Sequence, residues 1–256
     1  MTDVLVCVKR VPSSAGKVTL TEDGQGVDGR TTGFTVSAHE ECAVELAVQV
    51  AAATGGSATV LSLGTPDAVE QLRNALGVGC TAAVLVDGEP SSYGPADVAR
   101  EIAAVVEAHE AEGRTYGLIL LGNDAADSGD FQVGIRVAYA LGRPVVNGVS
   151  KVTVADEEVT AQGSGPDGPE TFRLPLPAVA TILEGGVEPR YPTVPGRMKA
   201  KKVVIEERPP VADPAGSRRI KMFLPPPTPS NVVVLGEGPA AAGAVVDLFE
   251  KLGVSK

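Results

Sequence analysis

The chain alternates short apolar runs with helical patterns through its first 141 residues. Each apolar run is only five or six residues long, as expected for a strand buried on both faces. Strands that alternate with helices of ten or more residues predict a parallel sheet with right-handed crossovers. The predicted strands are 4–8, 59–63, 82–86 and 116–121, and the predicted helices are 37–54, 67–76, 95–112 and 131–141. Ligands of such sheets bind beyond the carboxyl ends of the strands, which directs attention to the loops after Val8, Leu63 and Leu121.

The start of the first long helix is marked by a capping box. Ser37 is followed three residues later by Glu40, and helical spacing of apolar residues continues to Gly55 and Gly56, which end the helix. The preceding residues 12–34 are rich in Gly, Asp and Thr, and we expect an irregular excursion or a small hairpin there.

The pattern changes after residue 148. Short strands at 149–155, 158–162, 171–174 and 178–183, with a Gly-Pro-Asp-Gly turn at 165–168, predict a β meander over 148–183. Beyond Ile205 the chain becomes proline-rich and extended, and a helix with an apolar face follows at 239–252. We therefore predict an α/β nucleotide-binding domain over 1–206 with a parallel sheet. Residues 207–256 are predicted to form an extended C-terminal arm whose terminal helix packs on a partner subunit.

Composition excludes several classes of protein. The net charge of −10 argues against nucleic-acid binding, which relies on phosphate neutralisation by Lys and Arg. Cys7, Cys42 and Cys80 have neither CxxC spacing nor nearby histidines, so we expect no metal site. Scattered thiols and the absence of a signal-peptide pattern predict a cytoplasmic protein. Because no apolar run reaches about 18 residues, we expect no membrane insertion.

The loop after the strand at 116–121 is the strongest candidate for a binding site. Residues 122–134 are polar and contain glycines, and they connect a buried strand to a helix whose N-terminus suits a phosphate. Gln132 could bond an adenine or ribose edge. The alternative is a long βα loop with acidic caps. His39, in the first turn of its helix, could face the same crevice, although a surface role is the preferred interpretation, and His109 is expected to be solvated beside Glu107 and Glu110.

A second candidate is the segment 188–202. Three prolines stiffen it, Val194 stands between polar residues, and a basic cluster follows at 197–202. A stiff loop with an apolar tip flanked by cations suits docking to an acidic partner surface. The alternative is a surface loop that its lysines merely solvate.

Several pieces of the chain, in this order, resemble the beta subunit of electron transfer flavoproteins. They are residues 4–11, 43–45, 120–134, 168–179, 188–191 and 198–202, so the resemblance spans residues 1 to 206. It implies a Rossmann-like α/β domain paired with an alpha subunit. That partner would hold the redox-active FAD, and this chain would hold a structural AMP, or a second FAD in electron-bifurcating relatives. The chain would then be an electron carrier subunit without catalytic residues of its own.

The resemblance also implies particular residues and partners. Position by position, the AMP site would comprise Cys7, Ser37, Leu63, Gly122, Asn123, Asp124, Ala125, Ala126, Asp127, Ser128, Gly129, Asp130, Phe131, Gln132 and Val133. His39 stands where animal members carry an aromatic residue near the flavin. The recognition loop that docks acyl-CoA dehydrogenases would comprise Arg190, Tyr191, Pro192, Thr193, Val194, Pro195, Gly196, Arg197, Met198 and Lys199. Its apolar anchor, typically Leu, is Val194, and the downstream electron acceptor would be a quinone oxidoreductase.

Three other interpretations are weaker. A stand-alone ATP-binding stress-type module would need a glycine-rich triphosphate loop, and it would not need residues 188–202. An ATP-pyrophosphatase-type enzyme would need an SGGxDS-like loop after the first strand, where the sequence reads KRVPSS. The glycines at 236–243 resemble a dinucleotide fingerprint, but no acidic residue follows about twenty positions on to hold a ribose.

Overall fold

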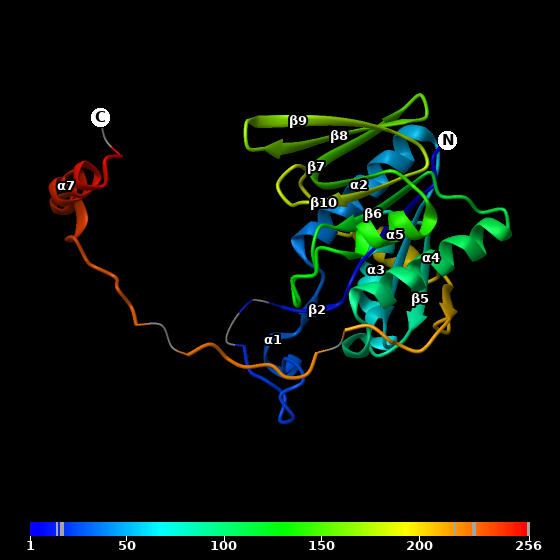
Figure 1. Ribbon diagram of the computed structural model, residues 1–256, viewed down its shortest axis with the longest axis horizontal. Coiled ribbons are helices and arrows are strands. Elements are labelled where there is room, and N and C mark those ends of the chain that lie inside the picture. Colours follow the sequence, from blue (N-terminus) through cyan, green and yellow to red (C-terminus); the bar gives the residue numbers. More distant parts are fainter. Residues whose placement is uncertain (14, 16–17, 218, 227–228, 255–256) are drawn as a thin grey trace. The chain divides into compact units, whose positions relative to one another are not determined.

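The computed structural model describes residues 1–13, 15, 18–217, 219–226 and 229–254. The chain divides into two units, Met1–Met222 and Phe223–Lys256. The first unit contains all the strands described (Figure 1).

The first unit is built on a nine-stranded sheet in the order β11-β5-β4-β1-β6-β10-β7-β8-β9. Neighbouring strands from β11 to β7 are parallel, whereas β7, β8 and β9 are antiparallel. The predicted α/β class with a parallel sheet is therefore confirmed. The strands of this sheet are β1 Val4–Cys7, β4 Ala58–Gly64, β5 Ala82–Asp87, β6 Leu118–Gly122, β7 Val145–Ala155, β8 Glu158–Gly165, β9 Gly168–Pro175, β10 Ala178–Ile182 and β11 Ile205–Arg208.

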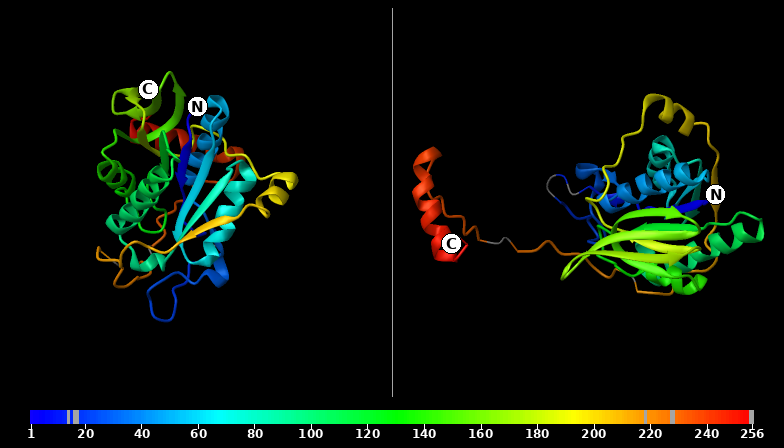
Figure 2. Two further views of the ribbon diagram at one scale, coloured as in Figure 1. Left: turned by 90° about the vertical axis from the view of Figure 1, so that its right-hand side faces the viewer. Right: turned by 90° about the horizontal axis from the view of Figure 1, so that it is seen from above.

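Helices cover both faces of the parallel part of the sheet (Figure 2). Side chains alternate along β1, so Val4 and Val6 join the core with α2 and α3, while Leu5 and Cys7 join the core with α4 and α5. This double burial explains why the parallel strands are continuous apolar runs. The helices of this unit are α1 Gly29–Thr32, α2 Ala38–Thr54, α3 Val69–Val78, α4 Pro95–Ala111, α5 Val133–Leu141 and α6 Val194–Ala200, with short 3-10 turns η1 Pro66–Ala68 and η2 Pro90–Ser92.

The capping residues at its two ends predicted the bounds of α2 correctly. Ser37 accepts a hydrogen bond from the backbone N–H of Glu40, and the Glu40 carboxylate accepts one from the backbone N–H of Ser37, which completes the predicted capping box. Gly55 ends the helix in the left-handed conformation. The excursion before α2 holds a two-stranded sheet of β2 Val11–Pro12 and β3 Phe34–Thr35.

The predicted meander is part of the main sheet. The strand predicted at 149–155 begins earlier, at Val145, because its first residues pair in parallel with β10. β10 lies between β6 and β7 and is parallel to both, so it belongs to the parallel sheet and not to a separate meander. The antiparallel part consists of β7, β8 and β9, since β7 pairs with β8 and β8 with β9.

Residues 207–222, which sequence analysis assigns to the arm, are fastened to the first unit. β11 pairs with β5 at the edge of the sheet, and the following residues cross the start of α4. Asp97, only 2% exposed, accepts hydrogen bonds from the backbone N–H groups of Ala215 and Gly216, and Glu101 accepts one from Val211. We call the described residues 209–217 and 219–222 the strap. Prolines predict extended backbone, but they do not predict which residues that backbone contacts.

His109 is buried, so the prediction that it is solvated was wrong. Its Nδ1 lies 2.7 Å from the Tyr116 hydroxyl, and its Nε2 lies 3.1 Å from the Glu206 carboxylate on β11. The position of His109 on α4 directs its ring inward. Glu206 on the edge strand β11, almost a hundred residues further along the chain, covers the ring.

The described residues of the second unit lie outside helices and strands except for the turn η3 Gly238–Ala241 and helix α7 Ala242–Leu252. The apolar face predicted for this helix is present, and its Val246, Phe249 and Leu252 are exposed. Within the described residues of this unit, no residue is buried. Packing on a partner subunit stays a prediction.

Candidate functional site

A cavity opens at the carboxyl edge of the parallel sheet, where the loops after β1, β4 and β6 converge. Strand order reverses at β1, since the chain runs outward through β4 and β5 and then returns to the other side with β6. Ligands of open α/β sheets bind at such a switch point. The lining residues are Cys7, Val8, Lys9, Glu40, Leu61, Leu63, Pro90, Tyr93, Pro95, Val98, Ile102, Leu121, Gly122, Asn123, Asp124, Ala125, Asp130, Val133 and Gly134.

The structure brings eight of the fifteen residues expected at the nucleotide into this lining. They are Cys7, Leu63, Gly122, Asn123, Asp124, Ala125, Asp130 and Val133. Asp127 and Ser128 line an adjoining outer chamber, and Ser37 contributes indirectly by capping α2. Ala126, Gly129, Phe131 and Gln132 line neither space.

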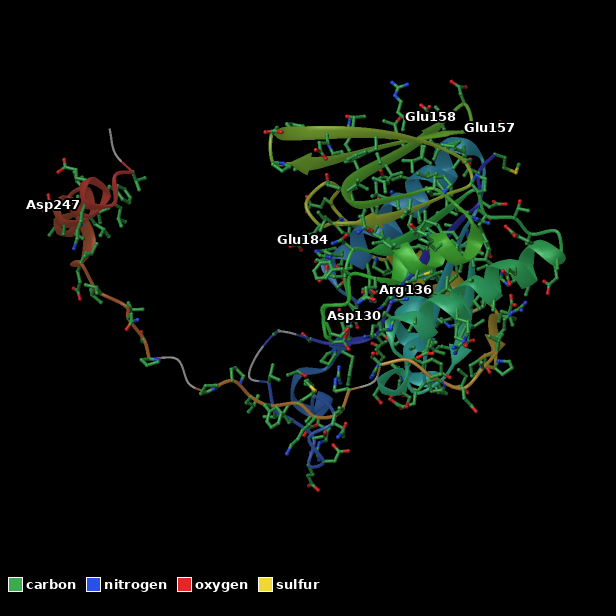
Figure 3. The ribbon with its side chains drawn as sticks, viewed as in Figure 1. Asp130, Arg136, Glu157, Glu158, Glu184 and Asp247 are labelled. Atoms are coloured by element: carbon green, nitrogen blue, oxygen red, sulfur yellow. The ribbon has the colours of Figure 1, made fainter. Side chains whose placement is uncertain are left out.

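Gln132 faces away from the cavity. Its side-chain oxygen accepts hydrogen bonds from Arg136 on α5 at 2.9 and 3.1 Å, and both residues line a separate groove between α4 and α5. Figure 3 shows Arg136 on α5 and Asp130 in the loop that precedes this helix. Because Gln132 makes no side-chain cap, the first N–H groups of α5 stay open to an acceptor.

Asp124 meets His39 beside the cavity. His39 Nδ1 lies 2.6 Å from Asp124 Oδ1, a contact that is favourable when Nδ1 carries the hydrogen. That oxygen is buried and has no other hydrogen-bond partner among the residues that the structure describes. His39 itself is absent from the cavity lining, and its relation to a flavin stays a prediction. A carboxylate oxygen accepts more than one hydrogen bond, so a ligand N–H or O–H would add to the contact with His39.

Cations gather in the outer chamber, which shares Lys9, Tyr93 and Asp130 with the cavity. Lys9 Nζ lies 2.6 Å from Asp127, and a guanidinium nitrogen of Arg219 on the strap lies 3.7 Å from the same carboxylate. The Arg10 guanidinium stacks 3.5 Å from the centre of the Phe34 ring, and its buried Nε has no partner within the described parts of the chain. Lys9 and Arg219 meet at Asp127, a position at which a phosphate would find two cations. Arg10 lies 3.8 Å from Asp67, and Asp23, Glu89 and Asp130 line the chamber as well.

Sequence analysis missed these cations as binding residues. Lys9 and Arg10 follow β1 directly, so their position at the carboxyl edge was a usable signal. Arg219 lies far along the chain in a segment without helix or strand periodicity, and no local pattern identifies it.

Glu40 forms the polar wall of the cavity. Its carboxylate accepts hydrogen bonds from the Ser37 N–H at 2.8 Å, the Ser37 hydroxyl at 2.9 Å and the Lys9 N–H at 2.6 Å. Burial raises the pKa of this carboxyl to about 7, although the hydrogen bonds from Ser37 and Lys9 act in the opposite direction.

The raised pKa of Glu40 predicts a pH effect on stability. A carboxyl whose pKa rises on folding from 4.5 to about 7 favours the folded state fully below pH 4.5 and loses this contribution as the pH rises to 7. Glu40→Gln should flatten the dependence, so the wild-type free energy of unfolding should fall by on the order of 2 kcal/mol more than that of the variant between pH 5 and 7.5. Urea unfolding at the two pH values measures this, and equal changes would contradict the assignment.

The segment 190–199, predicted as a stiff loop, is only partly a loop. Thr193 accepts a hydrogen bond from the Gly196 N–H and caps α6, so residues from Val194 onward are helical. Tyr191, Val194 and Met198 are 89%, 73% and 63% exposed.

An ion pair that sequence analysis missed fastens the start of this segment. The Arg190 guanidinium lies 2.6 and 2.8 Å from the carboxylate of Glu45 on α2, a residue only 2% exposed. The two residues are 145 positions apart. Arg190 thus anchors the segment and holds the pKa of Glu45 below its usual value, against the opposing effect of burial.

The described ranges of the chain lack two other kinds of feature. None of their helices combines the length and apolar character needed to cross a membrane. No cluster of three or more His, Cys, Asp or Glu side chains within those ranges is arranged to hold a metal ion.

The chain is similar to proteins of one family. A family model described as "Electron transfer flavoprotein domain" matches residues 27–213. The chain is 30% identical to "Electron transfer flavoprotein subunit beta" of Bacillus subtilis (strain 168) over 96% of this chain and 97% of the relative. Proteins of the same name from Bradyrhizobium diazoefficiens and Homo sapiens are 36% and 34% identical, over 80% and 79% of both chains.

Proposed function

This chain belongs to the electron transfer flavoprotein family as a beta subunit, and we propose that it holds an adenine nucleotide, AMP, in the cavity at the carboxyl edge of its sheet. It pairs with an alpha subunit that carries most of the FAD contacts, and it accepts electrons from dehydrogenases, acyl-CoA dehydrogenases among them. A quinone oxidoreductase takes the electrons onward. The chain works in the cytoplasm as an electron carrier subunit and makes or breaks no substrate bond.

The place of Asp124 in the cavity lining carries the nucleotide proposal, because His39 is the only donor beside its buried Oδ1 among the described residues. The adenine amino group or a ribose hydroxyl supplies a second donor to this carboxylate. Apolar side chains of Cys7, Leu63 and Val133 line the same cavity and suit the faces of a purine. The residues present therefore fit an adenine nucleotide.

Two cations of the outer chamber would hold the phosphate. Lys9 and Arg219 both lie against the carboxylate of Asp127. A phosphate that displaces the Asp127 carboxylate from Lys9 would gain charge-assisted hydrogen bonds. FAD, when bound in the heterodimer, supplies the redox chemistry. The residues of this chain position the nucleotide, exclude water from the apolar cavity and present the docking surface.

The continuity of the cavity with the outer chamber also favours a second candidate, an electron-bifurcating subunit with a second FAD in place of AMP. A pyrophosphate carries more charge than a single phosphate and would use Arg10 as well as Lys9 and Arg219. Acid extraction of the purified heterodimer, followed by chromatography of the released nucleotides, tests both. One FAD and one AMP per heterodimer support the simple carrier, and two FAD support bifurcation. A stable monomer that retains no nucleotide and never co-purifies with a flavin-bound partner would refute both.

Val194→Asp tests the docking surface. Val194 is exposed at the first position of α6, where an acidic residue suits the helix dipole, so folding should be unaffected. A desolvated apolar anchor is worth about 2 kcal/mol or more in an interface. We therefore expect the KM for the dehydrogenase to rise about tenfold or more, with unchanged nucleotide content.

Val204→Asp is the matched control for this experiment, because Val204 is equally exposed but lies outside the segment 190–199. It should leave the KM unchanged. Unaltered kinetics in Val194→Asp would remove the docking proposal and leave the nucleotide proposal standing.

A further inference from the structure

A second hollow lies apart from the nucleotide cavity, between α2, α3 and the segment 188–197. Its floor is apolar, and its rim carries charged and amide side chains. We call it the α2–α3 groove. The lining residues are Val8, Phe34, Thr35, Val36, Glu41, Val44, Glu70, Gln71, Asn74, Ala75, Val78, Glu188, Pro189, Arg190, Tyr191, Pro192 and Arg197.

Gln71 places an unsatisfied acceptor in this groove. The residue is only 4% exposed, and its buried Oε1 has no hydrogen-bond partner in the described portion of the chain. An acceptor buried without a donor destabilises the free protein, and a donor brought by a ligand removes that penalty. The groove is therefore suited to a ligand with an N–H or O–H group.

The charge of the rim indicates the charge of that ligand. Glu41, Glu70 and Glu188 line the rim and form no ion pair with any described residue. Of the two arginines present, Arg190 is already paired with Glu45, which leaves Arg197 alone against three carboxylates. Partial burial raises the pKa of Glu41, as expected for a poorly solvated carboxylate without a cation beside it. The groove thus favours a cation.

The position of the groove points to the protein that brings this cation. Tyr191, Pro192 and Arg197 form one wall and also belong to the segment 190–199. Gly77 on α3 permits this close approach, since a Cβ there would meet the Cβ of Pro192 at 3.0 Å. A protein docked on Val194 would thus reach the groove from the same surface.

We propose that the α2–α3 groove receives a lysine or arginine side chain of the docked dehydrogenase. The aliphatic stem packs on Val44, Ala75 and Val78, and the cationic N–H groups bond Gln71 Oε1 and a rim carboxylate. This inference rests on the proposed docking function. It adds that the partner contributes a cationic side chain and that the α2–α3 groove of this chain binds it.

The test measures electron transfer from acyl-CoA dehydrogenase to the holo-heterodimer carrying Gln71→Leu or Glu41→Gln. Leucine keeps the volume and removes the acceptor, so thermal stability should be equal or higher. The KM for the dehydrogenase should rise three- to tenfold in each variant, while kcat and nucleotide content stay constant. Glu41→Gln should also weaken the dependence of KM on NaCl concentration. Gln162→Leu, at an exposed position on β8, is the control and should change nothing.

The outcomes separate this inference from the docking proposal. If Val194→Asp raises the KM and both groove variants leave it unchanged, the inference is overturned and the docking proposal stands. If none of the three raises the KM, both fall. If Gln71→Leu is less stable than the wild type, the KM of Glu41→Gln alone decides between these outcomes. Agmatine, a free alkylguanidinium, should compete with the dehydrogenase in the wild type and not in Gln71→Leu. Agmatine binding to the wild type without any effect on KM would identify a small-cation site and overturn the inference.

Discussion

Gly122→Val is expected to lower the affinity of the heterodimer for its adenine nucleotide by roughly a hundredfold. A Cβ at Gly122 would lie 2.8 Å from Glu40 Cγ and 3.3 Å from His39 Cβ. Glu40 cannot yield, because two hydrogen bonds from Ser37 and one from Lys9 hold its carboxylate. The clash must therefore move the loop that carries Asp124. Nucleotide content after gel filtration, and affinity by titration of the stripped protein, measure the loss.

The control for this variant is Gly243→Ala. Gly243 lies in α7 with open space around the position of a Cβ, so alanine should be neutral or slightly stabilising. Full nucleotide retention in Gly122→Val would show that the loop tolerates displacement and that the cavity is not the binding site.

Asp97→Ala is expected to lower the free energy of unfolding by about 3 kcal/mol and to release the strap. The buried carboxylate of Asp97 accepts hydrogen bonds from the N–H groups of Gly94, Ala215 and Gly216, and it pairs with Arg100. Alanine leaves all these donors without their acceptor. Urea unfolding gives the stability change, and limited trypsin digestion at Arg219 reports the release.

Asp87→Ala serves as the comparison, since Asp87 is exposed at the end of β5 and its side chain makes no hydrogen bond or ion pair in the described ranges. The free energy of unfolding of Asp87→Ala should stay within about 0.5 kcal/mol of that of the wild type. If Asp97→Ala unfolds like the wild type and its Arg219 is cleaved no faster, the carboxylate does not hold the strap.

Elements specified by neighbouring residues were predictable from the sequence. The capping box of Ser37 and Glu40, the Gly55 end of α2 and the four apolar runs that became β1, β4, β5 and β6 all depend on local chemistry. The resemblance and the strand pattern together also predicted that the loop after β6 lies at a cavity. The loop is polar, and the order of strands and helices places it at the carboxyl edge of the parallel sheet.

Features formed by distant residues were not predictable in this way. The insertion of β10 between β6 and β7 depends on pairing partners that no local pattern encodes. His109 looked solvated because its sequence neighbours are acidic, yet Glu206 covers it from β11. The Glu45–Arg190 pair, the Asp124–His39 contact and the unsatisfied oxygen of Gln71 likewise appear only when the chain is folded.

The order of strands has a consequence for synthesis of the chain on the ribosome. When β6 is synthesised, its neighbour β1 has already been made, but its other neighbour, β10, lies some 60 residues downstream. The distance along the chain from β5 to its neighbour β11 is longer still. A nascent chain therefore carries two unpaired strand edges, and such edges are templates for aggregation. Because β11 follows all the other described strands of the sheet in sequence, a chain that stops before Ile205 would lack one edge strand of its sheet.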